Sequence, residues 1–324
     1  MDLAGDSPPP SVEELDTPGP NADAIIDPKF GIWIENEAGF SLDKISLLKH
    51  NFHEHPLLQL DQLEALAKRL LPLGQCRFIS PGATQKSEFI HHPTSPDGRD
   101  LSEVFKSISK PGSWVALYNA EVDPLYGNLV KDALSSVEEL IARDAPGIFS
   151  PQAFIFISAP PSVTPFHIDR ENNFWLQIRG RKIMNVWDRN DRGVLPASTV
   201  ENFIIDKSLD NVTLSDELMP KKFEWDLGEA EGVYFPSTSP HSTRTTDEWV
   251  SPENGVSISI GMVFYTDATR RDAYIHSFNR FMRKFYLDPK FPGESRYDDV
   301  KSLLGRWLVA LKKRLRNYTP PTGF

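Results

Sequence analysis

The sequence predicts a mainly β protein whose strands form a sandwich, a barrel or a jelly roll, with helices before and after them. From residue 153 to 265, short β-branched or aromatic segments alternate with Gly, Pro, Asn or Asp turns and show no helical pattern between them. On either side of this region, apolar residues recur at helical spacing. At 324 residues, the chain is long enough for one large or two modest domains.

The N-terminal part predicts a tail followed by alternating strands and helices. Residues 1–22 are acidic and rich in proline, so we expect them to form a disordered tail. Residues 30–35 alternate like a strand. Leucine repeats at helical spacing over 57–71, which ends at a Pro-Leu-Gly stop, and 76–79 form a short strand.

A capping box marks the start of the next helix. Asp100 is a suitable N-cap and Glu103 lies three residues later, before an apolar stripe that ends at a Pro-Gly pair. We predict a strand over 114–118 and an amphipathic helix over 129–141.

The second half supplies the strands of the predicted β domain. They are expected at residues 153–157, 166–169, 174–178, 182–187, 203–205, 223–225, 232–235 and 256–265. From residue 274 the pattern returns to helix, with 300–315 amphipathic. We therefore divide the chain into the tail 1–22, a β domain with its N-terminal covering elements over 23–268, and a basic helical extension over 269–324.

Charge and cysteine content exclude several classes of protein. The net charge is −10, yet residues 270–324 carry thirteen Lys or Arg and only five Asp or Glu. These basic residues are interleaved with apolar ones, so we expect them to pack on the acidic body or a second subunit rather than on nucleic acid. No apolar run could span a membrane, and the N-terminus lacks the features of a secretory signal. The single cysteine, Cys76, excludes internal disulfides and cysteine-based zinc sites, which favours the cytoplasm.

Three residues form a candidate metal site. His167 and Asp169 lie two apart on a predicted strand, so their side chains should point to the same face. His241 follows at the end of a later strand region and supplies a third ligand. Two histidines and one carboxylate on one side of a metal, with open positions opposite, are typical of non-haem Fe(II) oxygenases.

The residues around this pair resemble a known family. Residues 164–182 read Thr-Pro-x-His-x-Asp-x-x-x-Asn-Phe-(aromatic)-x-Gln-Ile-(basic)-Gly-x-Lys, which resembles the core of JmjC-type, cupin-like Fe(II)- and 2-oxoglutarate-dependent oxygenases. Among these it is most similar to the asparaginyl hydroxylase type that acts on hypoxia-inducible factor. The likeness extends more loosely over 232–241 and 256–265. It implies a double-stranded β-helix, the jelly roll of this family, with N-terminal α/β elements and C-terminal helices around it.

The resemblance also implies a role for each matching residue. His167, Asp169 and His241 would bind Fe(2+), and no catalytic residue beyond these ligands is implied. Lys182 would pair with the distal carboxylate of 2-oxoglutarate, and the Thr164 hydroxyl would hydrogen-bond to the same group.

Three further residues would complete the cosubstrate pocket by the same resemblance. Asn173 would line it, Trp175 would help to wall it, and Tyr118 would contact 2-oxoglutarate from an earlier strand. Gly261 stands where the family often has Asn, which is a departure, and Ser257 or Ser259 would have to substitute.

Other histidines have weaker patterns. His50, His53 and His55 have metal-like spacing but precede Pro56 in an apparent loop, and His91–His92 lie in a polar loop. We expect both groups at the surface.

The function favoured by the sequence is that of a dioxygenase using Fe(2+), 2-oxoglutarate and O2 to hydroxylate a C–H bond, most readily on a protein or peptide side chain. A small-molecule hydroxylase of the same chemistry, a non-catalytic cupin-like regulator and a cupin metalloenzyme without 2-oxoglutarate are the alternatives. The amphipathic C-terminal helix suggests a homodimer. Neither nucleic acid nor a membrane is an expected partner.

Overall fold

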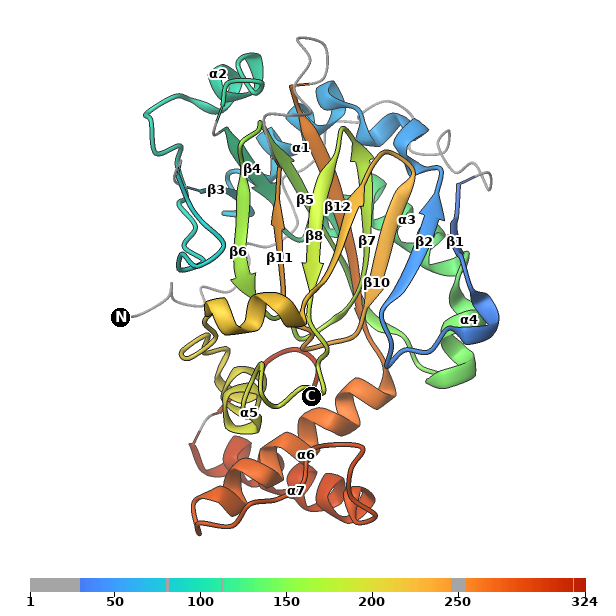
Figure 1. The fold of residues 1–324 in the computed structure, drawn as a ribbon, viewed down its shortest axis with the longest axis vertical. Coiled ribbons are helices and arrows are strands. Elements are labelled where there is room, and N and C mark those ends of the chain that lie inside the picture. Colours follow the sequence, from blue (N-terminus) through green and yellow to red (C-terminus); the bar gives the residue numbers. More distant parts are fainter. Residues whose placement is uncertain (1–29, 80–81, 112, 246–254, 317) are drawn as a thin grey trace.

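A computed structural model describes residues 30–79, 82–111, 113–245, 255–316 and 318–324. The predicted tail over 1–22 lies outside the described residues. Figure 1 shows two antiparallel sheets with helices beside and below them. The protein is therefore mainly β with several surrounding helices, as the sequence predicted. Within the described part of the chain, no helix is both long enough and apolar enough to cross a membrane.

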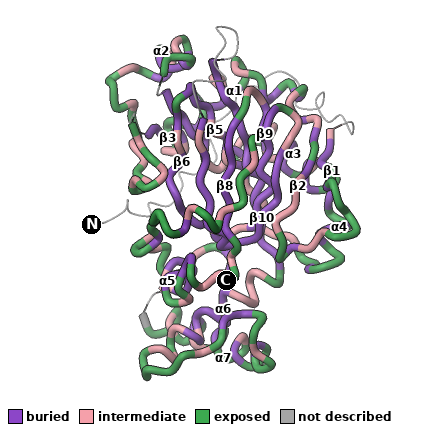
Figure 2. The backbone as a smooth tube through the Cα atoms, viewed as in Figure 1, coloured by how far each residue is buried: buried purple, intermediate pink, exposed green. Residues whose placement is uncertain are grey.

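The larger sheet has eight strands. In spatial order they are β1 (Ile32–Ile34), β2 (Ser46–His50), β10 (Glu231–Phe235), β7 (Asn172–Arg179), β12 (Ser257–Tyr265), β5 (Phe149–Ser158), β4 (Trp114–Leu117) and β3 (Cys76–Phe78). All of the pairings are antiparallel. β7 and β12 are buried along nearly their whole length, as Figure 2 shows for the centre of the molecule.

The smaller sheet has four strands. In spatial order they are β6 (Val163–His167), β11 (His241–Arg244), β8 (Lys182–Val186) and β9 (Phe223–Leu227). These pairings are also antiparallel. The β11 strand was not predicted as a strand, although its first residue, His241, was expected near a strand end.

The two sheets pack on each other through side chains of alternating residues. Trp175 and Phe235 of the larger sheet cluster with Met184, Val186 and Leu227 of the smaller one. Because side chains alternate across a strand, the next residues of the same parity also point between the sheets. The opposite face of the larger sheet forms the main hydrophobic core with the N-terminal helices.

Seven α-helices and five short 3-10 helices surround the sheets. The α-helices are α1 (Leu60–Leu70), α2 (Leu101–Lys106), α3 (Pro124–Ser135), α4 (Glu138–Asp144), α5 (Ala197–Asp206), α6 (Asp267–Arg283) and α7 (Asp298–Arg316) within the described residues. The 3-10 helices are η2 (Glu37–Gly39), η3 (Phe52–Glu54), η4 (Pro56–Leu58), η5 (Ala120–Val122) and η6 (Asp216–Lys221). Figure 1 places α6 and α7 together at one end of the molecule, below the sheets.

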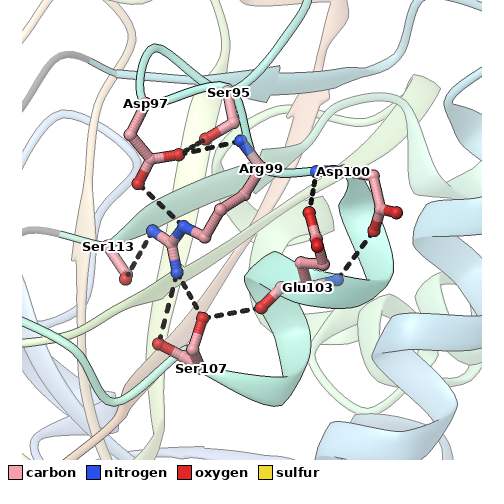
Figure 3. Close-up of polar contacts among 7 residues, drawn as sticks. All are labelled: Ser95, Asp97, Arg99, Asp100, Glu103, Ser107 and Ser113. Atoms are coloured by element: carbon pink, nitrogen blue, oxygen red, sulfur yellow. Dashed lines mark hydrogen bonds and ion pairs between the residues drawn. The ribbon is translucent and has the colours of Figure 1, made fainter.

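The capping box of α2 forms as predicted. The Asp100 carboxylate accepts a hydrogen bond from the Glu103 amide at 2.8 Å, and Glu103 accepts one from the Asp100 amide at 2.9 Å. Figure 3 shows that Arg99 reaches from the same turn to Asp97, Ser107 and Ser113. These contacts tie the segment before α2 to the residue preceding β4, so the chain that leads into the helix is held at both ends.

Two predicted elements differ from the structure, and a further strand was missed. The helix expected over 129–141 is two helices, α3 and α4, with the break at Ser136 and Val137. Residues 203–205 lie in α5 rather than in a strand, because their apolar side chains bury against Trp187 and the smaller sheet. The β2 strand was not predicted at all.

The last helix packs on α6 through a narrow face. Lys301, Gly305 and Val309 are buried and recur every four residues along α7. A Cβ atom at Gly305 would overlap the Tyr274 carbonyl oxygen, so the glycine permits the close approach of the two helices. The large apolar residues of α7 remain exposed on its other faces; they are Val300, Leu303, Leu304, Trp307, Leu311 and Leu315.

Candidate metal centre

The two candidate histidines meet because β6 and β11 are neighbours. His241 is the register partner of His167, and their ring centroids lie 4.1 Å apart. The β6 strand ends at His167, so Asp169 lies in the turn that follows rather than on the strand as predicted. The Thr238 amide donates a hydrogen bond to the Asp169 carbonyl at 2.8 Å, which fixes this turn against the loop that leads to His241.

The three side chains present one ligand atom each to a common point. The ligand atoms of His167, Asp169 and His241 all lie within 4.8 Å of one another. Asp169 Oδ2 lies 3.4 Å from His241 Nε2 and 4.0 Å from His167 Nε2. Among the described residues, no other group of three His, Cys, Asp or Glu converges in this way. The set matches the ligand types of a 2-His-1-carboxylate metal site.

Backbone hydrogen bonds hold both imidazoles in the form that binds metal. His167 Nδ1 lies 2.7 Å from the Pro165 carbonyl oxygen, and His241 Nδ1 lies 3.0 Å from that of Ser239. A carbonyl oxygen can only accept, so each Nδ1 carries the proton. Each Nε2 then has its lone pair free and directed toward Asp169, as in second-shell contacts of known metal sites.

Burial and charge keep the site in the ionisation state that binds a cation. Burial lowers the pKa of His167 to about 3, so its imidazole is neutral at physiological pH. Burial alone would raise the pKa of Asp169, but its interactions with His241 and His167 outweigh burial, and the net pKa is lowered. Neutral imidazoles and an ionised carboxylate are the forms in which these groups bind a divalent cation.

A layer of aromatic rings covers one side of the site. The Phe89 ring stacks on His167 at 4.4 Å, and Phe235 lies 4.6 Å from His241. Phe89 also contacts the ring of His91, whose Nε2 lies 3.1 Å from the Tyr118 hydroxyl. These rings exclude water from the histidine side of the site, whereas the Asp169 side chain is 26% exposed.

The sequence pattern missed His91 because it placed this residue in a surface loop, and it gave no prediction for Phe89. The His91 ring instead stacks at 5.8 Å from Trp114 and lies 5.2 Å from Tyr118. Burial lowers its pKa to about 4. No local signal distinguishes this histidine from its neighbour, since its burial depends on strand β4 and on the segment that leads to α2.

Lys182 is buried between the sheets without a partner. It has the parity of Met184 and Val186 on β8, so its side chain points toward the larger sheet, and it is 2% exposed. Within the described part of the chain, its ammonium group has no hydrogen bond or ion pair. Burial lowers its pKa to about 8. An unpaired buried ammonium is costly, which indicates a place for an anion.

Thr164 lies on the same face of the smaller sheet. Its register partner on β11 is Thr243, which is in turn the partner of Met184 on β8. Thr164 is buried, and it points between the sheets with Lys182 two strands away.

Opposite Lys182, the larger sheet presents polar atoms that have no partner within the described residues. They are Asn173 Oδ1 and Gln177 Oε1 on β7 and Ser259 Oγ on β12. Gln177 and Ser259 are register partners, and Asn173 shares the parity of Gln177 and Trp175. Buried polar groups in proteins are nearly always hydrogen-bonded, so this lining fits a polar ligand.

The departure at Gly261 has a structural counterpart. A Cβ atom at Gly261 would lie 3.1 Å from Asn173 Oδ1, so the Asn173 amide occupies the space that a side chain at 261 would fill. Of the two serines considered as substitutes, Ser257 accepts a hydrogen bond from Gln177 at 3.0 Å. Ser259 has no partner among the described residues and is the better candidate.

The remaining histidine group is structural. His50 and His55 are buried rather than at the surface as predicted. Nδ1 of each accepts a backbone hydrogen bond, from Phe52 and Leu57 respectively, and His50 Nε2 contacts the Gln177 carbonyl at 3.1 Å. These nitrogens are therefore committed to backbone groups and do not form a metal site.

Comparisons with known proteins find structural likenesses at low sequence identity. No family model matches the chain, and no curated protein matches it in sequence. The ribosomal oxygenase YcfD from Escherichia coli is 14% identical with a TM-score of 0.45, over 87% of this chain and 68% of that one. Its structure with cobalt and 2-oxoglutarate gives a TM-score of 0.46 over 88% and 69%. A structure of the DMSP lyases RdDddP and RnDddQII covers 35% of this chain with a TM-score of 0.21 and 10% identity. All three TM-scores lie below 0.5.

Proposed function

We propose that this protein is an Fe(II)- and 2-oxoglutarate-dependent dioxygenase that hydroxylates a C–H bond. The observation that carries the proposal is the convergence of His167, Asp169 and His241 in a buried site, with both imidazoles fixed by backbone carbonyl groups. Nitrogen and oxygen ligands of this composition suit Fe(2+). When bound, iron, 2-oxoglutarate and O2 supply the oxidising power for C–H hydroxylation, with 2-oxoglutarate converted to succinate and CO2.

The interior between the sheets supports 2-oxoglutarate as the cosubstrate. A dicarboxylate needs a cation and hydrogen-bond donors to offset its desolvation. Lys182 supplies the cation, and Thr164 adds a hydroxyl on the same face. Asn173 and Ser259 supply polar groups from the opposite sheet. We assign Trp175 to the apolar wall of this pocket, where it packs on Met184 and Val233.

The surrounding side chains would position the reactants and exclude water. Phe89 and Phe235 shield the two histidines, so access to the metal is from the side of Asp169. Tyr118, which directly follows strand β4, is oriented by its hydrogen bond with His91, and we propose that it contacts the cosubstrate. Excluding water and fixing orientation are the main contributions of a protein to cofactor chemistry of this kind.

The resemblance over residues 164–182 supports the finer parts of the proposal. On that basis we propose a jelly-roll fold of the JmjC or cupin type, closest to the asparaginyl hydroxylase type, and a protein or peptide side chain as the substrate. A small-molecule substrate would use the same metal and cosubstrate residues. We place the reaction in the cytoplasm, since the single cysteine, Cys76, can form no internal disulfide and disulfides are typical of oxidising compartments.

Binding of metal and cosubstrate can be followed without knowing the substrate. Anaerobic addition of Fe(II) and 2-oxoglutarate should produce a weak visible charge-transfer band, because 2-oxoglutarate would bind directly to the iron. His167→Ala and Asp169→Ala should abolish this band, since each removes one of three protein ligands. His53→Ala, which changes a histidine outside the site, should leave it intact.

The outcome separates the proposal from its alternatives. A parent protein that binds metal but shows no such band and no 2-oxoglutarate turnover contradicts the dioxygenase and favours a non-catalytic regulator or another metalloenzyme. If the band forms, 2-oxoglutarate turnover with protein fractions and with small-molecule fractions of a cell extract distinguishes the two substrate classes.

We further propose that the protein is a homodimer that buries the exposed apolar face of α7. This face carries Leu303, Trp307 and Leu311, and apolar patches of this extent are typical of interaction surfaces. A second copy of the same helix could cover it symmetrically.

A further inference from the structure

A cavity lies in the helical end of the molecule, apart from the metal centre. It has a volume of about 620 Å3 and is enclosed by the end of α5, by α6 and α7, and by the segment after α7. Its lining residues are Asp206, Ser277, Arg280, Phe281, Lys284, Leu308, Lys312, Tyr318 and Thr319. None of them lies on a strand of either sheet. Small-molecule sites in proteins span about 300–1,000 Å3, so the size fits a metabolite.

The charge of the lining selects an anion. Three basic residues, Arg280, Lys284 and Lys312, and one acidic residue, Asp206, border the cavity. Arg280 and Asp206 already form an ion pair at 2.5 Å. Lys284 caps the end of α6 and Lys312 lies on α7, so the two lysines reach the cavity from different segments. Such an arrangement matches a multiply charged group such as phosphate, which lysine binds as a point charge.

A buried hydroxyl group provides an independent indication of a ligand. Ser277 is 3% exposed and lines the cavity from α6. Its Oγ has no hydrogen-bond partner within the described residues. A buried hydroxyl without a partner is costly, and an oxygen of a bound ligand would satisfy it.

The remaining wall is apolar and aromatic. Phe281, Leu308 and Tyr318 line it. The Tyr318 hydroxyl donates to the Ile205 carbonyl at 3.1 Å, which holds the ring in place, and the Lys312 ammonium lies 5.5 Å from the ring centroid. The cavity thus places a fixed aromatic ring beside a cation, an arrangement that suits a ligand with both a flat ring and a phosphate group.

We propose that this cavity binds an organic phosphate of nucleotide size. Lys284, Lys312 and Arg280 contact the phosphate groups, and Ser277 donates to a phosphate oxygen. Phe281 and Tyr318 pack on the base, and the Asp206 carboxylate accepts from a sugar hydroxyl. The site is independent of the metal centre, so it can be tested whether or not the protein is a dioxygenase.

Calorimetry on the full-length protein tests this site with three defined probes: ADP, pyrophosphate and adenosine. ADP should bind, pyrophosphate should bind more weakly because it lacks a base, and adenosine should not bind because it lacks the charge. The double variant Lys284→Ala/Lys312→Ala should weaken ADP binding by about tenfold or more, since two charge-assisted contacts are lost. Lys313→Ala, one residue further along α7 and exposed, is the matched control and should leave the affinity unchanged.

Each contrary result overturns the proposal. Absence of ADP binding at millimolar concentration excludes a nucleotide site. Equal affinity for pyrophosphate and ADP would show that the aromatic wall does not contact the base. If Lys313→Ala weakens ADP binding as much as the double variant does, the phosphate is attracted by the overall charge of the basic extension and not by this cavity. Circular dichroism of the variants establishes that they remain folded.

Discussion

Two buried lysines in different regions of the molecule have opposite surroundings. Lys182 lies between the sheets with no partner in the described part of the chain, and burial lowers its pKa to about 8. Lys301 lies at the junction of α6 and α7, where it pairs with buried Asp298 at 3.2 Å and donates to the Lys290 carbonyl at 2.7 Å. Both side chains are largely removed from water, but only the second is compensated from within the protein.

The difference distinguishes a group kept for a ligand from a group that holds the fold together. A buried charge without a partner costs stability, and a protein retains it where a bound anion can compensate it. In a buried ion pair each charge already compensates the other, so neither charge is available to bind a ligand. The charge of Lys182 is therefore available for a ligand, whereas the charge of Lys301 is structural.

The largest effect is expected from Lys182→Met, which keeps the length of the side chain and removes its charge. 2-Oxoglutarate affinity should fall about a hundredfold, because a desolvated ion pair with the distal carboxylate is lost. Metal affinity should be unchanged. The ligand-free variant should be about 1–3 kcal/mol more stable to urea at pH 7, since an unpaired buried charge has been removed.

The pH dependence of that stability gain provides the control. The folded-state pKa of Lys182, about 8, lies below its ordinary value of 10.5, so the cost of the charge is fully present below pH 8. The stability difference between variant and parent should therefore shrink as the pH rises from 8 toward 10.5. A stability difference that does not change over this range would contradict an unpaired buried charge at Lys182. An unaltered 2-oxoglutarate affinity would remove Lys182 from the cosubstrate site.

The same substitution at Lys301 should lower the stability of the protein, whereas Lys182→Met should raise it. Lys301→Met leaves the Asp298 carboxylate buried, with the Gly293 amide at 2.7 Å as its remaining donor. The free energy of unfolding should fall by about 2–4 kcal/mol, because a broken buried pair leaves an uncompensated charge. Urea denaturation measures this loss, and 2-oxoglutarate affinity should stay the same. A neutral or stabilising result would mean that the two lysines do not differ as described.

The smallest effect on stability is expected at the exposed face of α7. Leu303 and Trp307 are 68% and 62% exposed, so Leu303→Ser/Trp307→Ser should change the stability of the monomer by only about 0.5 kcal/mol. Sedimentation should nevertheless show the proposed dimer dissociating into monomers, whereas Lys313→Ser keeps it. A parent protein that sediments as a monomer contradicts the dimer directly.

Local patterns in the sequence predicted the elements whose side chains interact within a few residues. The α2 capping box depends on two residues three apart, and the α1 helix on leucines within one turn of each other. Residues 203–205 were predicted wrongly as a strand because three consecutive apolar residues suit either a strand or a helix. Their packing against Trp187 and the smaller sheet, which no local pattern contains, selects the helix α5.

The sequence by itself determined the kind of chemistry available, because residue types and spacing do not depend on the fold. It supplied the imidazoles of His167 and His241, the Asp169 carboxylate and the Lys182 ammonium. The tertiary structure decided which of these groups meet and which remain unpaired. Pairing of β11 with β6 brings His241 beside His167, and the loop before α2 places the His91 ring against Tyr118. The sheets bury Lys182 where no described residue pairs with it. These outcomes arise from contacts between residues far apart in the chain, whose geometry only the folded sheets define.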